Sequence, residues 1–269
     1  MVVRASLLRL GGGAALAMAL FRCTSFDGTS SVNVLGDGDA SFDAASEEDA
    51  RSSDAGVHAA PRCDSGCPGT AGSCAVRAGA TCIDATEVTV ADYRAFVENA
   101  QGTTVDPGAP CDPVSVEPLG ALPDDALPMT KVTFCEARAF CLWAGKRLCG
   151  RVGGGPLDPT ESRTQKSAWF NACTGGVSDD FHPLSDGGCQ VDASAPRAAG
   201  AGCQGGVPGL FDMIGNVWEW VDQPNEVEAP SAIIMGGGYD DPTRARCPGL
   251  LAAAVDFRSA SVGFRCCSP

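Results

Sequence analysis

The stretch Gly209-Leu-Phe-Asp-Met-Ile-Gly-Asn-Val-Trp-Glu-Trp220 decides the fold of this chain. Two tryptophans flank one glutamate directly after a Gly-Asn pair, a string too unusual to arise from composition alone. Two shorter motifs follow it, Gly236-Gly-Gly-Tyr239 and Val262-Gly-Phe-Arg-Cys-Cys267. The 34 glycines and 18 prolines are spread along the chain, so long regular elements are few. These patterns predict a compact α+β domain with much irregular backbone.

Two helices are predicted with a mechanism for their first turn. Thr89 and Thr133 each precede an acidic residue by three positions, which is the spacing of a capping box. Apolar side chains then recur at helical spacing, and Gly102 and Gly145 end the two runs. Ala232 to Met235 is predicted to be a short buried strand. The tryptophans, which are Trp143, Trp169, Trp218 and Trp220, are expected to pack in the core.

The cysteine content indicates a disulfide framework. The chain has 15 cysteines, far more than a cytosolic protein of 269 residues normally carries. Leaving out Cys23, an even number remains between Cys63 and Cys267. Zinc is the alternative, but the sequence lacks paired Cys-x-x-Cys knuckles, and its 2 histidines are His58 and His182.

The first fifth of the chain differs from the rest. Residues 1–23 carry Arg4 and Arg9 before a short apolar run, as an export signal does. Cys23 allows lipid attachment and hence a membrane anchor, with ordinary cleavage or an uncleaved anchor as the alternatives. Residues 24–61 form an acidic segment without large apolar side chains and are predicted to be a flexible tether before a domain at 62–269. The net charge of -14 argues against nucleic acid as a partner.

The chain resembles the sulfatase-modifying-factor family, whose members include the formylglycine-generating enzymes. The resemblance covers about residues 75–269 and makes the chain a divergent, exported, bacterial-type member. Besides the motifs above, it rests on Cys82-Ile-Asp-Ala-Thr-Glu-Val-Thr89, Phe140-Cys-Leu-Trp-Ala-Gly-Lys-Arg-Leu148 and Trp169-Phe-Asn-Ala-Cys173. It implies a low-regularity fold related to C-type lectins, stapled by disulfides and calcium. It also implies the bridges Cys141–Cys266 and Cys173–Cys247, with Cys189–Cys203 as a local loop bridge.

The positions that carry the family's chemistry are altered here. Enzymes of this family oxidise a substrate cysteine to formylglycine with copper held by two thiolates. Those thiolates follow a Gly-Gly-Ser-Tyr-like turn, which in this chain reads Gly236 to Tyr239, with Gly238 in place of the serine. The ligand positions hold Asp241 and Arg246, neither of which can replace a thiolate on Cu(I). Copper is therefore not expected.

One structural calcium ion is implied by the resemblance at the Gly-Asn-Val-Trp-Glu loop. The expected ligands are the Glu219 carboxylate, the carbonyls of Ile214, Gly215 and Val217, and Asn216. Oxygen ligands in flexible geometry suit Ca²⁺. The alternative is that Glu219 caps or pairs locally between two core tryptophans. A second calcium loop is not recognisable between Val177 and Cys203.

Other chemistries find little support in the sequence. His182 lies in a polar loop and is expected to be a solvated surface residue, Asp240-Asp241 to be turn formers, and Lys146-Arg147 to be structural. The main hypothesis is a non-catalytic binding or scaffold module outside the cytoplasm, for an unknown protein, peptide or glycan. The alternatives are an oxidase whose thiols have moved to reduced Cys247 and a second cysteine, and a calcium-dependent glycan or peptide binder.

Overall fold

The structure is a computed structural model that describes residues 66–69, 71–177, 188–225 and 230–269. The predicted leader, the tether, Cys23, Cys63 and His182 lie outside the described residues. The elements in chain order are β1 (Ala75–Ala78), β2 (Thr81–Asp84), α1 (Val90–Ala100), β3 (Thr104–Val105), β4 (Val114–Ser115), α2 (Phe134–Trp143), β5 (Arg147–Leu148), α3 (Ala168–Thr174), β6 (Trp218–Asn225), β7 (Ser231–Met235), β8 (Leu250–Ala254), β9 (Val262–Phe264) and β10 (Cys266–Ser268).

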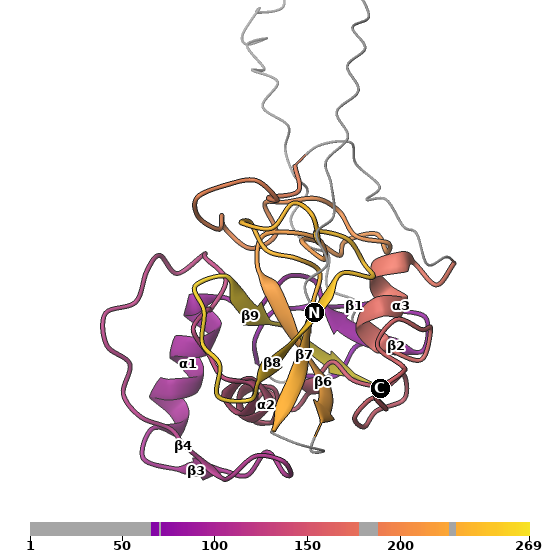
Figure 1. The fold of residues 1–269 in the computed structure, drawn as a ribbon. Coiled ribbons are helices and arrows are strands. Elements are labelled where there is room, and N and C mark those ends of the chain that lie inside the picture. Colours follow the sequence, from indigo (N-terminus) through magenta and orange to yellow (C-terminus); the bar gives the residue numbers. More distant parts are fainter. Residues whose placement is uncertain (1–65, 70, 178–187, 226–229) are drawn as a thin grey trace, which may run out of the picture. The chain divides into compact units, whose positions relative to one another are not determined.

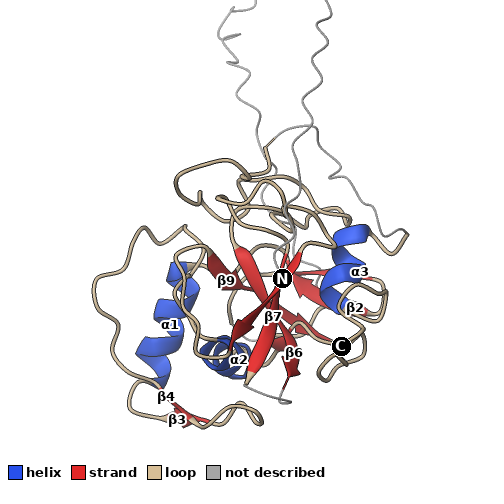
Figure 2. Ribbon diagram, viewed as in Figure 1, coloured by secondary structure: helices blue, strands red, loops and turns tan. Residues whose placement is uncertain are grey.

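Short strands form two four-stranded sheets and a small hairpin. The first sheet has the order β1-β2-β10-β5, and the second has the order β8-β7-β6-β9. Pairing is antiparallel except between β6 and β9, which run parallel with Trp218 opposite Val262. Strands β3 and β4 form the hairpin. Loops and turns make up much of the remaining chain, as Figure 2 shows, so the predicted irregular α+β fold is confirmed.

The two predicted helices are present with their predicted caps. In α1 the Thr89 hydroxyl accepts from the Asp92 amide, and the Asp92 side chain accepts from the Thr89 amide. Thr133 and Glu136 repeat this reciprocal pair at the start of α2. The buried faces, which include Tyr93 and Phe96, follow the predicted spacing. The predicted strand is also confirmed, as β7. Helix α3, which begins after an Ser167 cap, was not predicted.

The core has two parts that meet at β6. Side chains alternate along this strand, so Trp218 and Trp220 pack with α1 and α2 while Val221 packs with α3 and Trp169. Figure 1 shows α1 and α2 on one side of the β6–β7 sheet and α3 on the other. The central stretch of the sequence therefore joins both halves of the core. In the described part of the chain, no helix has the length and hydrophobicity that a membrane span requires.

Candidate functional site

The Gly236–Tyr239 turn follows β7 and lies against the central stretch. The Tyr239 amide donates to the Asn216 carbonyl at 2.9 Å. A Cβ added at Gly238 would lie 2.9 Å from Cδ1 of Trp218 and 3.0 Å from Oδ1 of Asp240, which is too close for either neighbour to stay in place. Glycine at this position therefore lets the turn pack on Trp218. A serine there would require the turn to move.

Asp241 and Arg246 stand at the positions where the sequence resemblance places the family's thiolates. The Asp241 carboxylate accepts from the Thr243 hydroxyl at 2.7 Å and from the Arg244 guanidinium at 2.9 Å. Burial raises the pKa of Asp241, but the hydrogen bonds from Thr243 and Arg244 outweigh it and lower the pKa overall. Arg246 is exposed. A hard carboxylate and a guanidinium are poor ligands for Cu(I), which prefers soft thiolates.

Every cysteine among the described residues is disulfide-bonded. The three bridges that the resemblance implies, Cys141–Cys266, Cys173–Cys247 and Cys189–Cys203, are present. Three further bridges are Cys67–Cys82, Cys111–Cys135 and Cys149–Cys267. The adjacent Cys266 and Cys267 lie on strand β10, whose alternation sends their sulfurs to different partners, as predicted. No described cysteine is thus left as a thiol for metal chemistry.

Glu219 is held by a guanidinium and an indole at the centre of the molecule. Arg265 donates from Nε to Oε2 and from Nη2 to Oε1 of Glu219, each at 2.7 Å. The indole nitrogen of Trp169 donates to Oε2 at 2.7 Å. The side chains of Arg265 and Glu219 are 0% and 1% exposed. Glu219 is therefore paired, as in the alternative to a calcium ligand, but with partners that are distant in the sequence.

Two further carboxylates surround this pair. Burial raises the pKa of Glu87 well above its usual value, and the neighbouring Asp212 and Glu219 raise it further. Burial also raises the pKa of Asp212 to about 6, although the Gly200 amide, Arg265 and Arg197 oppose the shift. Oε2 of Glu87 and Oδ1 of Asp212 have no hydrogen-bond partner. The acidic cluster is therefore balanced by guanidinium groups rather than fully hydrogen-bonded.

The remaining calcium-loop residues have structural contacts of their own. The Asn216 side chain donates to Oε1 of Glu87 at 2.9 Å and accepts from the Arg197 amide at 3.0 Å. Ile214, Gly215 and Val217 are buried, and the Gly215 amide donates to the Gly236 carbonyl. In the part of the chain that the structure describes, no group of three His, Cys, Asp or Glu residues is arranged to hold a metal. Calcium at this loop stays a prediction, and Glu219 does not fit as its ligand while Arg265 occupies both oxygens.

A second buried ion pair lies within the first sheet, between Asp84 at the end of β2 and Lys146 just before β5. The Lys146 ammonium donates to Oδ1 of Asp84 at 2.6 Å and to the Ser73 carbonyl at 2.7 Å. Burial raises the pKa of Asp84 to about 6, although Lys146 lowers it. The structural role expected of Lys146 is therefore observed. Sequence reasoning missed the partners Asp84, Glu87, Asp212 and Arg265, because a motif fixes residue types but not which charges meet across the fold.

The chain is similar to curated proteins over part of its length. It is 28% identical over 165 residues to the "Inactive C-alpha-formylglycine-generating enzyme 2" of Bos taurus, a match that covers 52% of this chain and 50% of the relative. It is 27% identical over 176 residues to the "Formylglycine-generating enzyme" of Mus musculus, which covers 52% of this chain and 43% of the relative. The chain thus spans about half the length of these relatives or less.

Similarity to solved structures and to the family's sequence profile completes the comparison. The structure titled "Crystal Structure of CarF" is 20% identical, with a TM-score of 0.46 and coverage of 76% of this chain and 96% of that chain. Residues 73–268 match the profile of the sulfatase-modifying factor enzyme 1-like domain. This match includes the paired tryptophans, the Gly236–Tyr239 turn and the cysteines of β10. With most of the domain covered, the chain belongs to the sulfatase-modifying factor enzyme 1-like family.

Proposed function

We propose that this chain is a non-catalytic binding module of the sulfatase-modifying-factor family that works outside the cytoplasm. The observation that carries the proposal is the chemistry of the ligand positions. Asp241 and Arg246 stand where the family has thiolates, and every described cysteine is in a disulfide. Copper-dependent oxidation of a cysteine needs soft ligands that this site does not offer.

Overall similarity does not separate the active and inactive relatives. The sequence identity is 28% to a relative named as inactive and 27% to one named as a formylglycine-generating enzyme, so the two identities differ by one percentage point. The choice between a catalytic and a non-catalytic function therefore depends on the residues of the site and not on overall sequence identity. The site lacks the ligands, and Gly238 lacks the hydroxyl that the family places beside the reacting centre.

An oxidase with relocated thiols is the second candidate, and the geometry does not favour it. Such an enzyme would need reduced Cys247 beside another reduced cysteine. Cys247 is 0% exposed and bridged to Cys173 in α3. A buried disulfide sulfur is neither a nucleophile nor a copper ligand.

The proposed location rests on the disulfides. Six bridges are formed within the described residues, and such a framework persists in oxidising compartments. An export signal in residues 1–23 and a lipid on Cys23 are part of the proposal and would place the module on a membrane surface. Mass analysis of the protein purified from its own cells tests both, because cleavage and acylation change the mass of the N-terminal peptide.

The functional proposal is tested by offering the purified protein a substrate of the family. A Cys-x-Pro-x-Arg peptide is incubated with the protein, copper and oxygen, and the aldehyde product is measured by mass spectrometry. An active formylglycine-generating enzyme serves as the positive control. No conversion is expected, and robust formylglycine formation by the unmodified protein would overturn the proposal.

A further inference from the structure

A groove of about 500 Å³ lies at the end of α2, away from the Gly236–Tyr239 turn. Its volume is within the roughly 300–1,000 Å³ range of small-molecule sites. Apolar side chains line part of it, and Arg138, Lys146, Arg147 and Asp222 supply the charges. Lys146 is already satisfied by Asp84 and Ser73. The chemistry of the groove therefore depends on Arg138, Arg147 and Asp222.

Asp222 presents a buried acceptor that lacks a donor. Its side chain is 7% exposed, and Oδ1 has no hydrogen-bond partner. The nearest cation, Nε of Arg138, is 3.7 Å away, which is too far for a hydrogen bond. An unsatisfied buried acceptor is unfavourable, so a group that donates to it would bind favourably. Asp222, on β6, lines the groove, while its Oδ1 atom is buried, so a ligand donor reaches this atom only when the side chain turns toward the groove.

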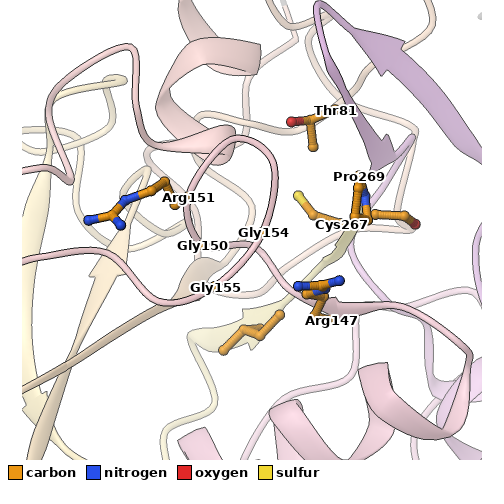
Figure 3. Close-up of a pocket in the computed structure, with 10 residues that line it drawn as sticks. Thr81, Arg147, Gly150, Arg151, Gly154, Gly155, Cys267 and Pro269 are labelled. Atoms are coloured by element: carbon orange, nitrogen blue, oxygen red, sulfur yellow. The ribbon is translucent and has the colours of Figure 1, made fainter.

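Arg147 presents a guanidinium whose charge acts on Asp222, where it opposes the rise in pKa that burial causes. The residue is exposed, and within the described ranges its side chain makes no hydrogen bond or ion pair. Figure 3 shows Arg147 beside Pro269 and next to the Gly154–Gly155 loop, while Arg151 points away on the other side of that loop. A Cβ at Gly154 would collide with the Arg147 guanidinium, so glycine there leaves room for it. The expected structural role of Arg147 thus has only an electrostatic basis, in contrast to the hydrogen-bonded Lys146.

Arg138 brings a second guanidinium to the same groove. Its Nη1 donates to the carbonyls of Gly108 and Ala109, at 3.1 and 2.7 Å, and this fixes its position. The guanidinium also lies over the Phe134 ring, 5.6 Å from the centroid. The guanidinium groups of Arg138 and Arg147 thus flank the buried carboxylate of Asp222. They disfavour an ammonium at Asp222 and favour a neutral donor such as a hydroxyl.

The charges of the groove favour a small molecule that carries both an anionic group and hydroxyl groups. The anion would pair with Arg147 and Arg138, a hydroxyl would donate to Asp222, and the apolar wall formed by Leu142, Leu148 and Pro156 would cover the frame. A sugar acid has this combination. The chain as a whole has a net charge of -14, so the groove is a local exception and not part of a general anion-binding surface.

We propose that the groove between α2, β5 and β6 binds an acidic saccharide, with its carboxylate on Arg147 and Arg138 and a hydroxyl on Asp222. This inference rests on the proposed function, because it names the ligand class and the surface of that binding module. It uses none of the residues that replace the family's catalytic thiols. The two proposals can therefore fail separately.

The test measures binding of a galacturonic acid trisaccharide by calorimetry to the full chain. Its methyl ester is the matched ligand, because it has the same shape without the charge. The acid is expected to bind at least about tenfold more tightly than the ester, and Arg147→Gln is expected to weaken binding of the acid by about tenfold or more. Arg163→Gln, which removes the same charge from an exposed position outside the groove, should leave the affinity unchanged.

Asp222→Asn separates the hydroxyl contact from the charge contact. It is expected to weaken the acid and the ester alike, by about fivefold to tenfold, because both keep the hydroxyls. Should this buried variant fail to fold, Arg147→Gln still decides. Equal binding of acid and ester, no effect of Arg147→Gln, or tighter binding of triglycine than of the sugar acid would overturn the inference. Peptide oxidation, measured separately, would overturn the non-catalytic function but not this site.

Discussion

Removing the Glu219 carboxylate should cost much of the stability of the domain. Glu219→Ala leaves the Arg265 guanidinium, which is 0% exposed, without its bidentate partner. Removal of one partner of a buried ion pair typically costs about 3–5 kcal/mol. The variant also leaves the buried indole N–H of Trp169 without its acceptor, which adds about 1–3 kcal/mol. We therefore expect a loss of at least about 3 kcal/mol in the free energy of unfolding.

Equilibrium unfolding in urea, with the disulfides intact, measures this loss with and without a calcium chelator. Asp125→Ala is the matched control, because it removes the carboxylate of an exposed pair with Arg94. An exposed pair of this kind is worth at most about 1 kcal/mol. The structural interpretation predicts that Glu219→Ala costs the same in chelator as without it. A cost below about 1 kcal/mol would refute the buried pair. A cost that disappears when chelator has already destabilised the parent would restore Glu219 as a calcium ligand.

Three further predictions test the cysteines, the altered site and the buried acids. A disulfide map of the purified domain should show no more than one free thiol, ignoring Cys23, and reduced Cys247 beside another reduced cysteine would contradict it. The double variant Asp241→Cys/Arg246→Cys should bind copper weakly and convert the peptide poorly. Gly238 supplies no hydroxyl, and Trp218 and Asp240 crowd the space that a serine side chain would take there. Efficient turnover would show that only the ligands are missing. The free energy of unfolding, measured in urea, should rise as the pH is lowered from about 8 to about 5. Burial raises the pKa of Asp84 and Asp212 to about 6, so the folded state takes up protons in this range, and the added stability is lost again as the pH rises through that value. Asp212→Asn should flatten the rise, and a steady fall in stability as the pH is lowered would contradict the prediction.

Local sequence signals predicted the elements that depend on local interactions. The capping boxes at Thr89 and Thr133 fixed the start of α1 and α2 because a cap involves only residues three positions apart. Helix α3 escaped prediction because it is only seven residues long and is stabilised by its bridge to Cys247 and by Trp169 in the core. Strands of two to four residues likewise depend on partners far along the chain, which no local pattern names.

The candidate site likewise combines features that the local sequence predicts with contacts that only the fold creates. The prediction that Asp241 and Arg246 stand in place of thiolates concerns residue type alone, so it can be made from the sequence and stays a prediction. The partner of Glu219 could not be predicted in this way, because Arg265 lies 46 positions away and reaches it only after β6 and β9 pair in parallel. Both residues were inside quoted motifs, yet their pairing required the fold. Asp222 and Arg138 lie outside the quoted motifs, and their contact at 3.7 Å, across 84 positions by their numbers, likewise depends on the fold.

Two consecutive residues in the loop after β7, Arg246 and Cys247, have different surroundings. Arg246 is exposed, whereas the next residue, Cys247, is 0% exposed and bridged to Cys173. A sulfur at 246 would face solvent and substrate, while the sulfur at 247 faces the core and ties the loop to α3. A fold with so little regular structure depends on such bridges, each worth about 2–4 kcal/mol. A thiol at 246 would therefore contribute little to stability, while loss of the Cys247 bridge would loosen the loop. On the proposed function, the chain keeps the cysteine that holds the fold and carries arginine where the reaction would need a thiolate.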